Sequence, residues 1–167
     1  MPEWQYAEDV IRIGTAGWNY QDWAGIVYPK PKPRGFDELS AIAGMFNMVE
    51  INSSFYGPPR RQAAQGWVDR VAGRPEFRFT AKLWTGFTHQ RSAAARDEAL
   101  FKDGIAPLVE ADRLGALLVQ FPWSYRNMPE NRLYLRRLHR QFAEYPLVLE
   151  IRHSSWTADD VLDELAE

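Results

Sequence analysis

Five short apolar segments recur along this chain, at residues 12–15, 48–52, 77–82, 117–120 and 148–153. In most of them a charged or amide residue occupies every second position. Because successive side chains of a β-strand point to opposite faces, this alternation predicts five strands. One face of the predicted sheet is apolar and holds Val49, Ile51, Phe79, Leu149 and Ile151. The other face is polar and holds Glu50, Asn52, Lys82, Gln120, Glu150 and Arg152.

Helix-like stretches separate the predicted strands. Apolar residues at helical spacing follow the first, second and fourth segments, at positions 39/42/43/46, 64/67/68/71 and 135/138/142. After the third segment, residues 100–109 predict a helix with Ile105, Leu108 and Val109 facing inward, which Pro107 should kink or restart. After the fifth, Thr157 is expected to cap a last helix whose inward residues are Val161, Leu162 and Leu165.

The order of elements is therefore βα repeated five times, which predicts parallel strands with right-handed crossovers. A flavodoxin-like doubly wound sheet and part of a (βα)₈ barrel both fit this order. A doubly wound sheet buries both faces under helices, so charged residues on one face favour the barrel. We expect an α/β fold with five of the eight βα units of a TIM-type barrel. On this interpretation residues 1–167 form a single domain that is incomplete at its C-terminal end, with two open sheet edges.

Composition argues against several classes of function for this chain. The 167 residues carry a net charge of −2, which gives no electrostatic reason to expect nucleic acid as a partner. The basic stretch from Arg132 to Arg140 is interpreted as a solvated helix face. The absence of cysteine excludes disulfides, zinc thiolates and thiol catalysis. No run approaches the roughly 18 apolar residues that cross a bilayer, so we expect no membrane partner and a cytoplasmic location.

Several motifs at the predicted strand ends are specific enough to suggest a family. They occupy residues 13–18, 49–56, 88–89, 118–122 and 150–156. Together they resemble the YecE-like family, catalogued as a domain of unknown function (number 72), from about residue 11 onward. The resemblance implies a TIM-type barrel that continues beyond the fifth βα unit. Trp123 stands where the family usually has a second proline, and Gly57 where a basic residue is frequent. The resemblance supplies no activity, substrate or cofactor.

The polar face and the loops that follow it provide the candidate site, because barrel enzymes react at the carboxyl ends of their strands. Glu50 and His89 are the candidate proton-transfer groups, and Lys82 would hold negative charge. Arg152 suits a carboxylate or phosphate through its planar fork of donors. The predicted ligand-binding set is Trp18, Asn52, Ser53, Phe55, Tyr56, Gln120, Glu150, Arg152 and His153, with Ser54 as a further hydroxyl and Trp123 as a stacking surface.

Three interpretations of these residues stay open. The protein is an enzyme, or a former enzyme, that binds a small polar ligand of anionic or sugar-like character at the barrel mouth. Alternatively it is a non-catalytic scaffold or interaction module whose charges form an internal lattice, with Glu50 paired to Lys82 or Arg152. Binding of single-stranded nucleic acid is a third and weaker hypothesis. Chelation of a metal by Glu50, Glu150 and His153 lacks any typical ligand spacing, so we predict no metal site. Self-association through the open sheet edges remains an expectation.

Overall fold

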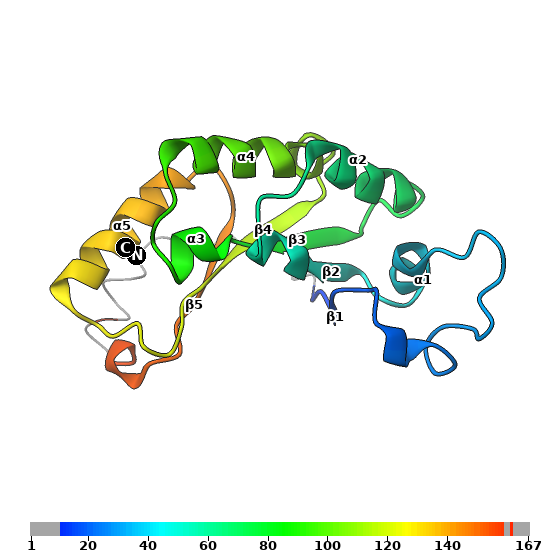
Figure 1. Cartoon of the computed structure of the whole chain (residues 1–167), viewed down its shortest axis with the longest axis horizontal. Coiled ribbons are helices and arrows are strands. Elements are labelled where there is room, and N and C mark those ends of the chain that lie inside the picture. Colours follow the sequence, from blue (N-terminus) through cyan, green and yellow to red (C-terminus); the bar gives the residue numbers. More distant parts are fainter. Residues whose placement is uncertain (1–10, 159–160, 162–167) are drawn as a thin grey trace.

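The computed structural model describes residues 11–158 and 161, and they contain a five-stranded parallel sheet (Figure 1). The strands are β1 (Gly14–Ala16), β2 (Met48–Ile51), β3 (Arg78–Lys82), β4 (Leu114–Gln120) and β5 (Leu147–Glu150). Each one overlaps a predicted segment. Their spatial order is their order along the chain, whereas a doubly wound sheet reverses direction in its middle. The predicted series of barrel-type βα units is therefore confirmed.

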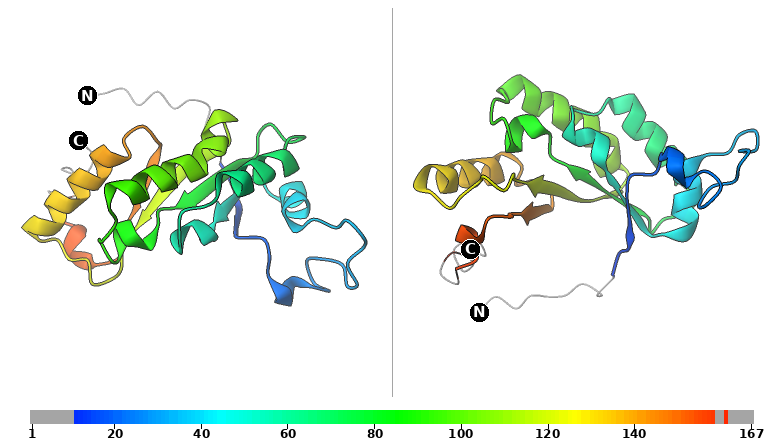
Figure 2. Two further views of the ribbon diagram at one scale, coloured as in Figure 1. Left: turned by 45° about the horizontal axis from the view of Figure 1, so that its top comes forward. Right: turned by 60° about the horizontal axis from the view of Figure 1, so that its bottom comes forward.

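Helices lie between the strands as the sequence predicts. They are α1 (Glu38–Met45), α2 (Arg61–Arg70), α3 (Thr85–Thr88), α4 (Ala95–Glu110) and α5 (Pro129–Gln141), with short 3₁₀ segments η1 (Gln21–Trp23), η2 (Asn52–Phe55) and η3 (Ser154–Trp156). Helices α2 and α4 run along one side of the sheet, and the same arrangement is seen when that side is turned forward (Figures 1 and 2). The short helix α3 is an element that the hydrophobic pattern did not predict.

The register of the strands assigns each side chain to a face. Val49 pairs with Phe79, and Ile51 pairs with Ala81, which pairs with Leu117. Partners in neighbouring parallel strands share a face, and these five residues are at most 1% exposed under the helices. The hydrophobic core therefore lies between the sheet and the helices, and the predicted apolar face is confirmed for β2 and β3.

Local side-chain chemistry sets the helix ends. The Asp37 side chain caps α1 by accepting a hydrogen bond from the backbone N–H of Ser40 at 2.7 Å. Its second oxygen lies 3.1 Å from Nη1 of Arg70 at the end of α2. Pro129 occupies the first turn of α5, where the missing N–H costs nothing. The caps explain why the predicted helices begin at these residues.

Helix α4 departs from its prediction in two ways. It continues through Pro107 without a break, because Ile105 and Leu108 are fully buried and their packing outweighs one lost backbone hydrogen bond. Its buried stripe is centred on Phe101, Ile105 and Leu108, so Val109 points away and is 44% exposed. The inward position predicted for Val109 is wrong.

Gly104 allows α4 to contact the loop that precedes α2. A Cβ atom at Gly104 would lie 2.1 Å from the carbonyl oxygen of Pro59, a distance that no side chain tolerates. The glycine that weakens the helical pattern in the sequence is thus explained by a close approach of backbone to backbone.

Strand β5 pairs with β4 and with no other strand of the described residues. Leu149 shares the face of the buried Val119 but is 37% exposed at this edge. Val161 is buried, while the predicted inward positions Leu162 and Leu165 lie outside the described residues. None of the helices in the described part of the chain is long and apolar enough to cross a membrane.

Candidate functional site

The register places four predicted polar residues on the sheet face opposite the helices. Glu50 pairs with Thr80, which shares its face with Lys82 two residues later. Lys82 pairs with Leu118, which shares its face with Gln120, and Gln120 pairs with Glu150. Lys82, Gln120 and Glu150 are the last residues of their strands. These polar side chains therefore meet at the carboxyl end of the sheet, as the alternation predicted.

Glu50 and Lys82 form an ion pair. Nζ of Lys82 lies 3.3 Å from Oε1 of Glu50, and the two side chains are 20% and 18% exposed. Such limited exposure makes the removal of either charge costly, because the other would be left without a partner in a partly dry site. The pair fits both the acid–base hypothesis and the structural-lattice hypothesis.

Glu150 is the centre of a second polar group. Its Oε1 atom accepts hydrogen bonds from Nε2 of Gln120 and from Nε of Arg152, both at 2.7 Å. The hydrogen bond from Gln120 is the main cause of a lowered Glu150 pKa, and Arg152 and the charge of Lys82 act in the same direction against burial. Lys82 thus links the two groups electrostatically, and Glu150 is an anion at neutral pH.

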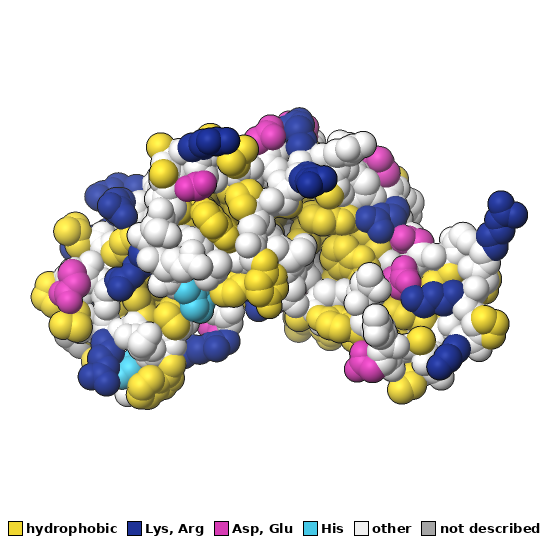
Figure 3. Space-filling model, viewed as in Figure 1, with side chains coloured by type: hydrophobic (Ala, Val, Ile, Leu, Met, Phe, Trp, Pro, Cys, Tyr) yellow, Lys and Arg dark blue, Asp and Glu magenta, His cyan; other side chains and the backbone are white. Residues whose placement is uncertain are grey.

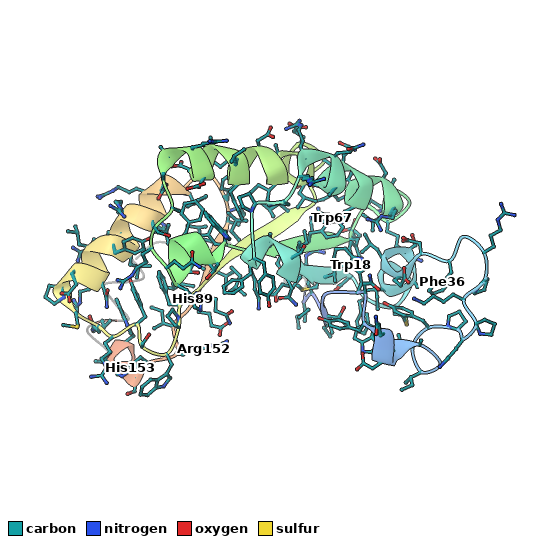
Figure 4. The ribbon with its side chains drawn as sticks, viewed as in Figure 1. Trp18, Phe36, Trp67, His89, Arg152 and His153 are labelled. Atoms are coloured by element: carbon teal, nitrogen blue, oxygen red, sulfur yellow. The ribbon has the colours of Figure 1, made fainter. Side chains whose placement is uncertain are left out.

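His89 ends helix α3, directly beyond β3, and its ring faces the same end of the sheet (Figure 4). Its Nδ1 atom lies 3.0 Å from the hydroxyl of Thr88, and the ring of Phe55 meets it edge-on with centroids 5.0 Å apart. Burial, and then the positive charge of Arg152, lower the pKa of His89 below its usual 6.5. The imidazole is therefore neutral at pH 7 and able to accept a proton.

Arg152 and His153 follow β5, which ends at Glu150. The strand thus stops before His153, which leaves the alternation and caps η3 by accepting a hydrogen bond from the Ser155 N–H. The His153 ring lies against Trp123, which follows β4, with centroids 4.8 Å apart. In the space-filling view two histidine patches lie at the lower left of the molecule, with dark blue Lys or Arg patches beside them (Figure 3).

Some predicted ligand-binding residues are engaged elsewhere. Trp18 packs edge-on against Trp67 of α2, on the helix side of the sheet. Nδ2 of Asn52 donates to the carbonyl of Ala16 at 2.8 Å, which ties η2 to β1. Ser53 is exposed, and Tyr56 is 79% exposed with its ring edge-on to Phe55. The structure therefore brings together the charged residues of the predicted set, whereas Trp18 and Asn52 make contacts with other parts of the fold.

Ser54 was expected as a donor at the mouth, and this expectation is wrong. The residue is fully buried, and its hydroxyl lies 2.7 Å from the carbonyl oxygen of Ile51 and 2.8 Å from that of Lys82. It holds the end of β2 against the end of β3, so it positions Glu50 and Lys82. A serine beside a strand end carries no sequence signal that separates these two roles.

Within residues 11–158 and 161, no three His, Cys, Asp or Glu side chains lie close enough together to hold a metal ion. Glu50, Glu150 and His153 therefore do not form the chelating group considered from the sequence.

A family model described as "Protein of unknown function DUF72" matches residues 12–167. The chain belongs to this family. It is 33% identical over 154 residues to the UPF0759 protein YunF of Bacillus subtilis, covering 88% of this chain and 52% of YunF. It is 26% identical over 153 residues to the UPF0759 protein YecE of Escherichia coli K12, covering 89% of this chain and 51% of YecE. The chain spans about half the length of these relatives.

Solved structures of DUF72 proteins share the fold. A crystal structure from Enterococcus faecalis superposes with a TM-score of 0.77 at 26% identity, covering 93% of this chain and 56% of that protein. One from Thermotoga maritima gives a TM-score of 0.71 at 29% identity, covering 92% of this chain and 60% of that protein. The resemblance found in the sequence motifs is thus confirmed at the level of family and fold.

Proposed function

We propose that the carboxyl end of the sheet binds a small polar ligand with a negative charge, and that Glu50 and His89 transfer protons to or from it. The observation that carries this proposal is the convergence of Glu50, Lys82, Gln120 and Glu150 from four successive strands onto one face. In TIM-type barrels this end of the strands is where active sites form. The membership of the DUF72 family is consistent with such a site but names no ligand.

Arg152 supplies the main contact for the negative charge. Its Nε atom is used by Glu150, while its two terminal nitrogens have no recorded partner in the described part of the chain. The side chain is 53% exposed and can be reached from solvent. A guanidinium presented in this way binds a carboxylate or phosphate through parallel hydrogen bonds. Lys82 adds positive charge on the same face.

His89 is suited to act as the general base. Its lowered pKa keeps the ring neutral at pH 7, and the Thr88 hydroxyl orients it through Nδ1. Nε2 has no recorded partner among the residues described, so it remains available to a ligand. Glu50, held by Lys82, supplies a second group for proton transfer, a carboxylate on the same face of the sheet as Lys82.

The test is titration calorimetry of the chain with inorganic phosphate and with a panel of hydroxy acids, sugar acids and sugar phosphates. We expect at least one anion to bind, and Arg152→Gln to weaken that binding about ten- to a hundredfold, because charge-assisted hydrogen bonds are lost. The matched control is Arg140→Gln, an exposed arginine of α5, which should bind like the unmodified chain. Equal losses in both variants, or no binding of any anion, would contradict the proposal.

The scaffold hypothesis is the second candidate, and one observation favours it. Glu50 pairs with Lys82, and Glu150 pairs with Gln120 and Arg152, so each carboxylate already has a partner inside the protein. Under this hypothesis no anion binds, and the role of Glu50 is to stabilise the fold through its pair with Lys82.

A further inference from the structure

We infer that Trp123 and His153 form a ring-binding subsite beside Arg152, and that the ligand is a monosaccharide carrying a carboxylate or a phosphate group. This inference rests on the proposed function, because Arg152 would bind the anionic group. It adds the class of the ligand and the residues that bind its ring.

Trp123 offers an accessible flat surface. It follows β4 by three residues, and 62% of its surface is exposed although indole is among the largest apolar side chains. Its ring lies at 56° to that of His153 with centroids 4.8 Å apart, so the indole is supported on one side. An exposed aromatic ring held in place by a neighbour loses little conformational freedom when a second ring stacks on it.

His153 is fixed in one tautomer by its surroundings. Its Nδ1 atom accepts a hydrogen bond from the backbone N–H of Ser155 at 3.1 Å and lies 2.9 Å from the Ser155 hydroxyl. That hydroxyl in turn accepts from the backbone N–H of Asn127 at 2.8 Å, so its own proton is free to point at Nδ1. The neutral ring therefore carries its proton on Nε2, which becomes a donor with no recorded partner among the described residues.

The two elements lie next to the anion site. His153 follows Arg152 directly in the sequence, and Figure 4 places His89, Arg152 and His153 in succession along the same end of the sheet. A ligand bound by its anionic group to the terminal nitrogens of Arg152 would extend toward the indole of Trp123. A ligand that uses both Arg152 and Trp123 needs a charged substituent for the guanidinium and a ring face for the indole.

The polar groups around this position favour a sugar ring over an aromatic ring. Glu150 uses Oε1 for Gln120 and Arg152, which leaves Oε2 as an acceptor, and His153 offers the Nε2 proton. A monosaccharide has hydroxyl groups around its edge for these partners and a face of C–H groups for the indole. An aromatic acid would stack on Trp123 but would leave the acceptor and the donor without partners, at a cost in affinity.

The test compares four probes on the same chain by titration calorimetry: inorganic phosphate, glucose 6-phosphate, glucuronate and benzoate. We expect glucose 6-phosphate or glucuronate to bind at least tenfold more tightly than phosphate or benzoate, and the better of the two identifies the charged group. Trp123→Ala should weaken sugar binding about five- to tenfold and leave phosphate binding within twofold. Trp123→Phe should recover part of the loss.

Two further variants test whether the effects are specific to the ring-binding subsite. His153→Asn keeps a side chain that caps η3 but removes the imidazole, so it should weaken sugar binding while the melting temperature stays unchanged. Leu133→Ala, an equally exposed apolar truncation on α5, should change neither. If phosphate binds and the sugar derivatives bind no better, the ring subsite is refuted while the anion site stands. Tighter binding of benzoate, or an equal effect of Trp123→Ala on phosphate and sugar, also refutes it. If no probe binds, the proposed function itself fails.

Discussion

Replacing Glu50 by Gln removes one charge from the site while preserving the shape of the side chain. Lys82 then keeps its positive charge on a side chain that is 20% exposed, and its ion-pair partner at 3.3 Å is gone. Glu150 lies close enough for the charge of Lys82 to influence its pKa, so part of the compensation remains. We therefore expect a clear loss of stability that is smaller than for an isolated buried charge.

The magnitude follows from the geometry of the pair. Two unit charges 3.3 Å apart attract by about 5 kcal/mol at an effective dielectric constant of about 20, and by about 1 kcal/mol in bulk water. The cost of removing the two charges from water offsets much of the attraction calculated at the lower dielectric constant. Surface ion pairs accordingly contribute only about 0–1 kcal/mol to stability, whereas removing one partner of a buried pair costs about 3–5 kcal/mol. For side chains that are about one-fifth exposed we expect a loss of about 2 kcal/mol, which lowers the melting temperature by about 4–8 °C.

The assay is thermal and urea unfolding followed by circular dichroism, with Glu110→Gln as the control. Glu110 also pairs with an arginine, Arg61, but both side chains are about half exposed. The melting temperature of Glu110→Gln should therefore not differ measurably from that of the unmodified chain. Adding Lys82→Met to Glu50→Gln should recover part of the lost stability, because no unpaired charge is left. Equal melting temperatures for Glu50→Gln and the control, or no recovery in the double variant, would refute this reasoning.

Two further predictions concern the scaffold of the site. Gly104→Ala should lower the free energy of unfolding by about 1–3 kcal/mol in urea titrations, because its Cβ would lie 2.1 Å from the Pro59 carbonyl oxygen. Gly66→Ala, a helical glycine with nothing within 4 Å of the added Cβ, should instead stabilise by about 0.5–1 kcal/mol, and the opposite order would contradict the packing argument. Asp37→Ala should cost about 1 kcal/mol at pH 7 through loss of the α1 cap. Burial raises the pKa of Asp37, but hydrogen bonding from Ser40 outweighs it and lowers the pKa below 3.8. The stabilisation by the Asp37 carboxylate is therefore fully present above about pH 4 and is lost as the pH falls through the lowered pKa. A difference in unfolding free energy between the unmodified chain and Asp37→Ala that persists in acid would refute this account.

Much of the fold follows from periodicity alone. The five apolar segments, most of them with a period-2 pattern, locate all five strands, and the helical stripes locate α1, α2 and α5, because burial of one face dominates the choice of residues. Val109 and Pro107 were misjudged because the pattern of one helix does not reveal which neighbour covers it. The short helix α3 buries residues of mixed character, including Gly86 and Thr88, and so has no stripe to detect.

The candidate site was predictable where strand geometry determines it. Glu50, Lys82, Gln120 and Glu150 fall on one face because parallel strands in register preserve side-chain parity. Residues in the loops were not predictable in the same way, since loop direction depends on tertiary contacts. Trp18 turns toward α2, and Ser54 turns into the core.

Each polar group of the site comes from its own βα unit, since four strands each deliver one side chain to the common face. Glu150 contacts Gln120 and Arg152, and the charge of Lys82 acts on both Glu50 and Glu150, so a substitution at one position alters contacts with a neighbouring unit while the strand pairing stays in place. The sheet can accordingly present other side chains at these four positions without a change in its strand order.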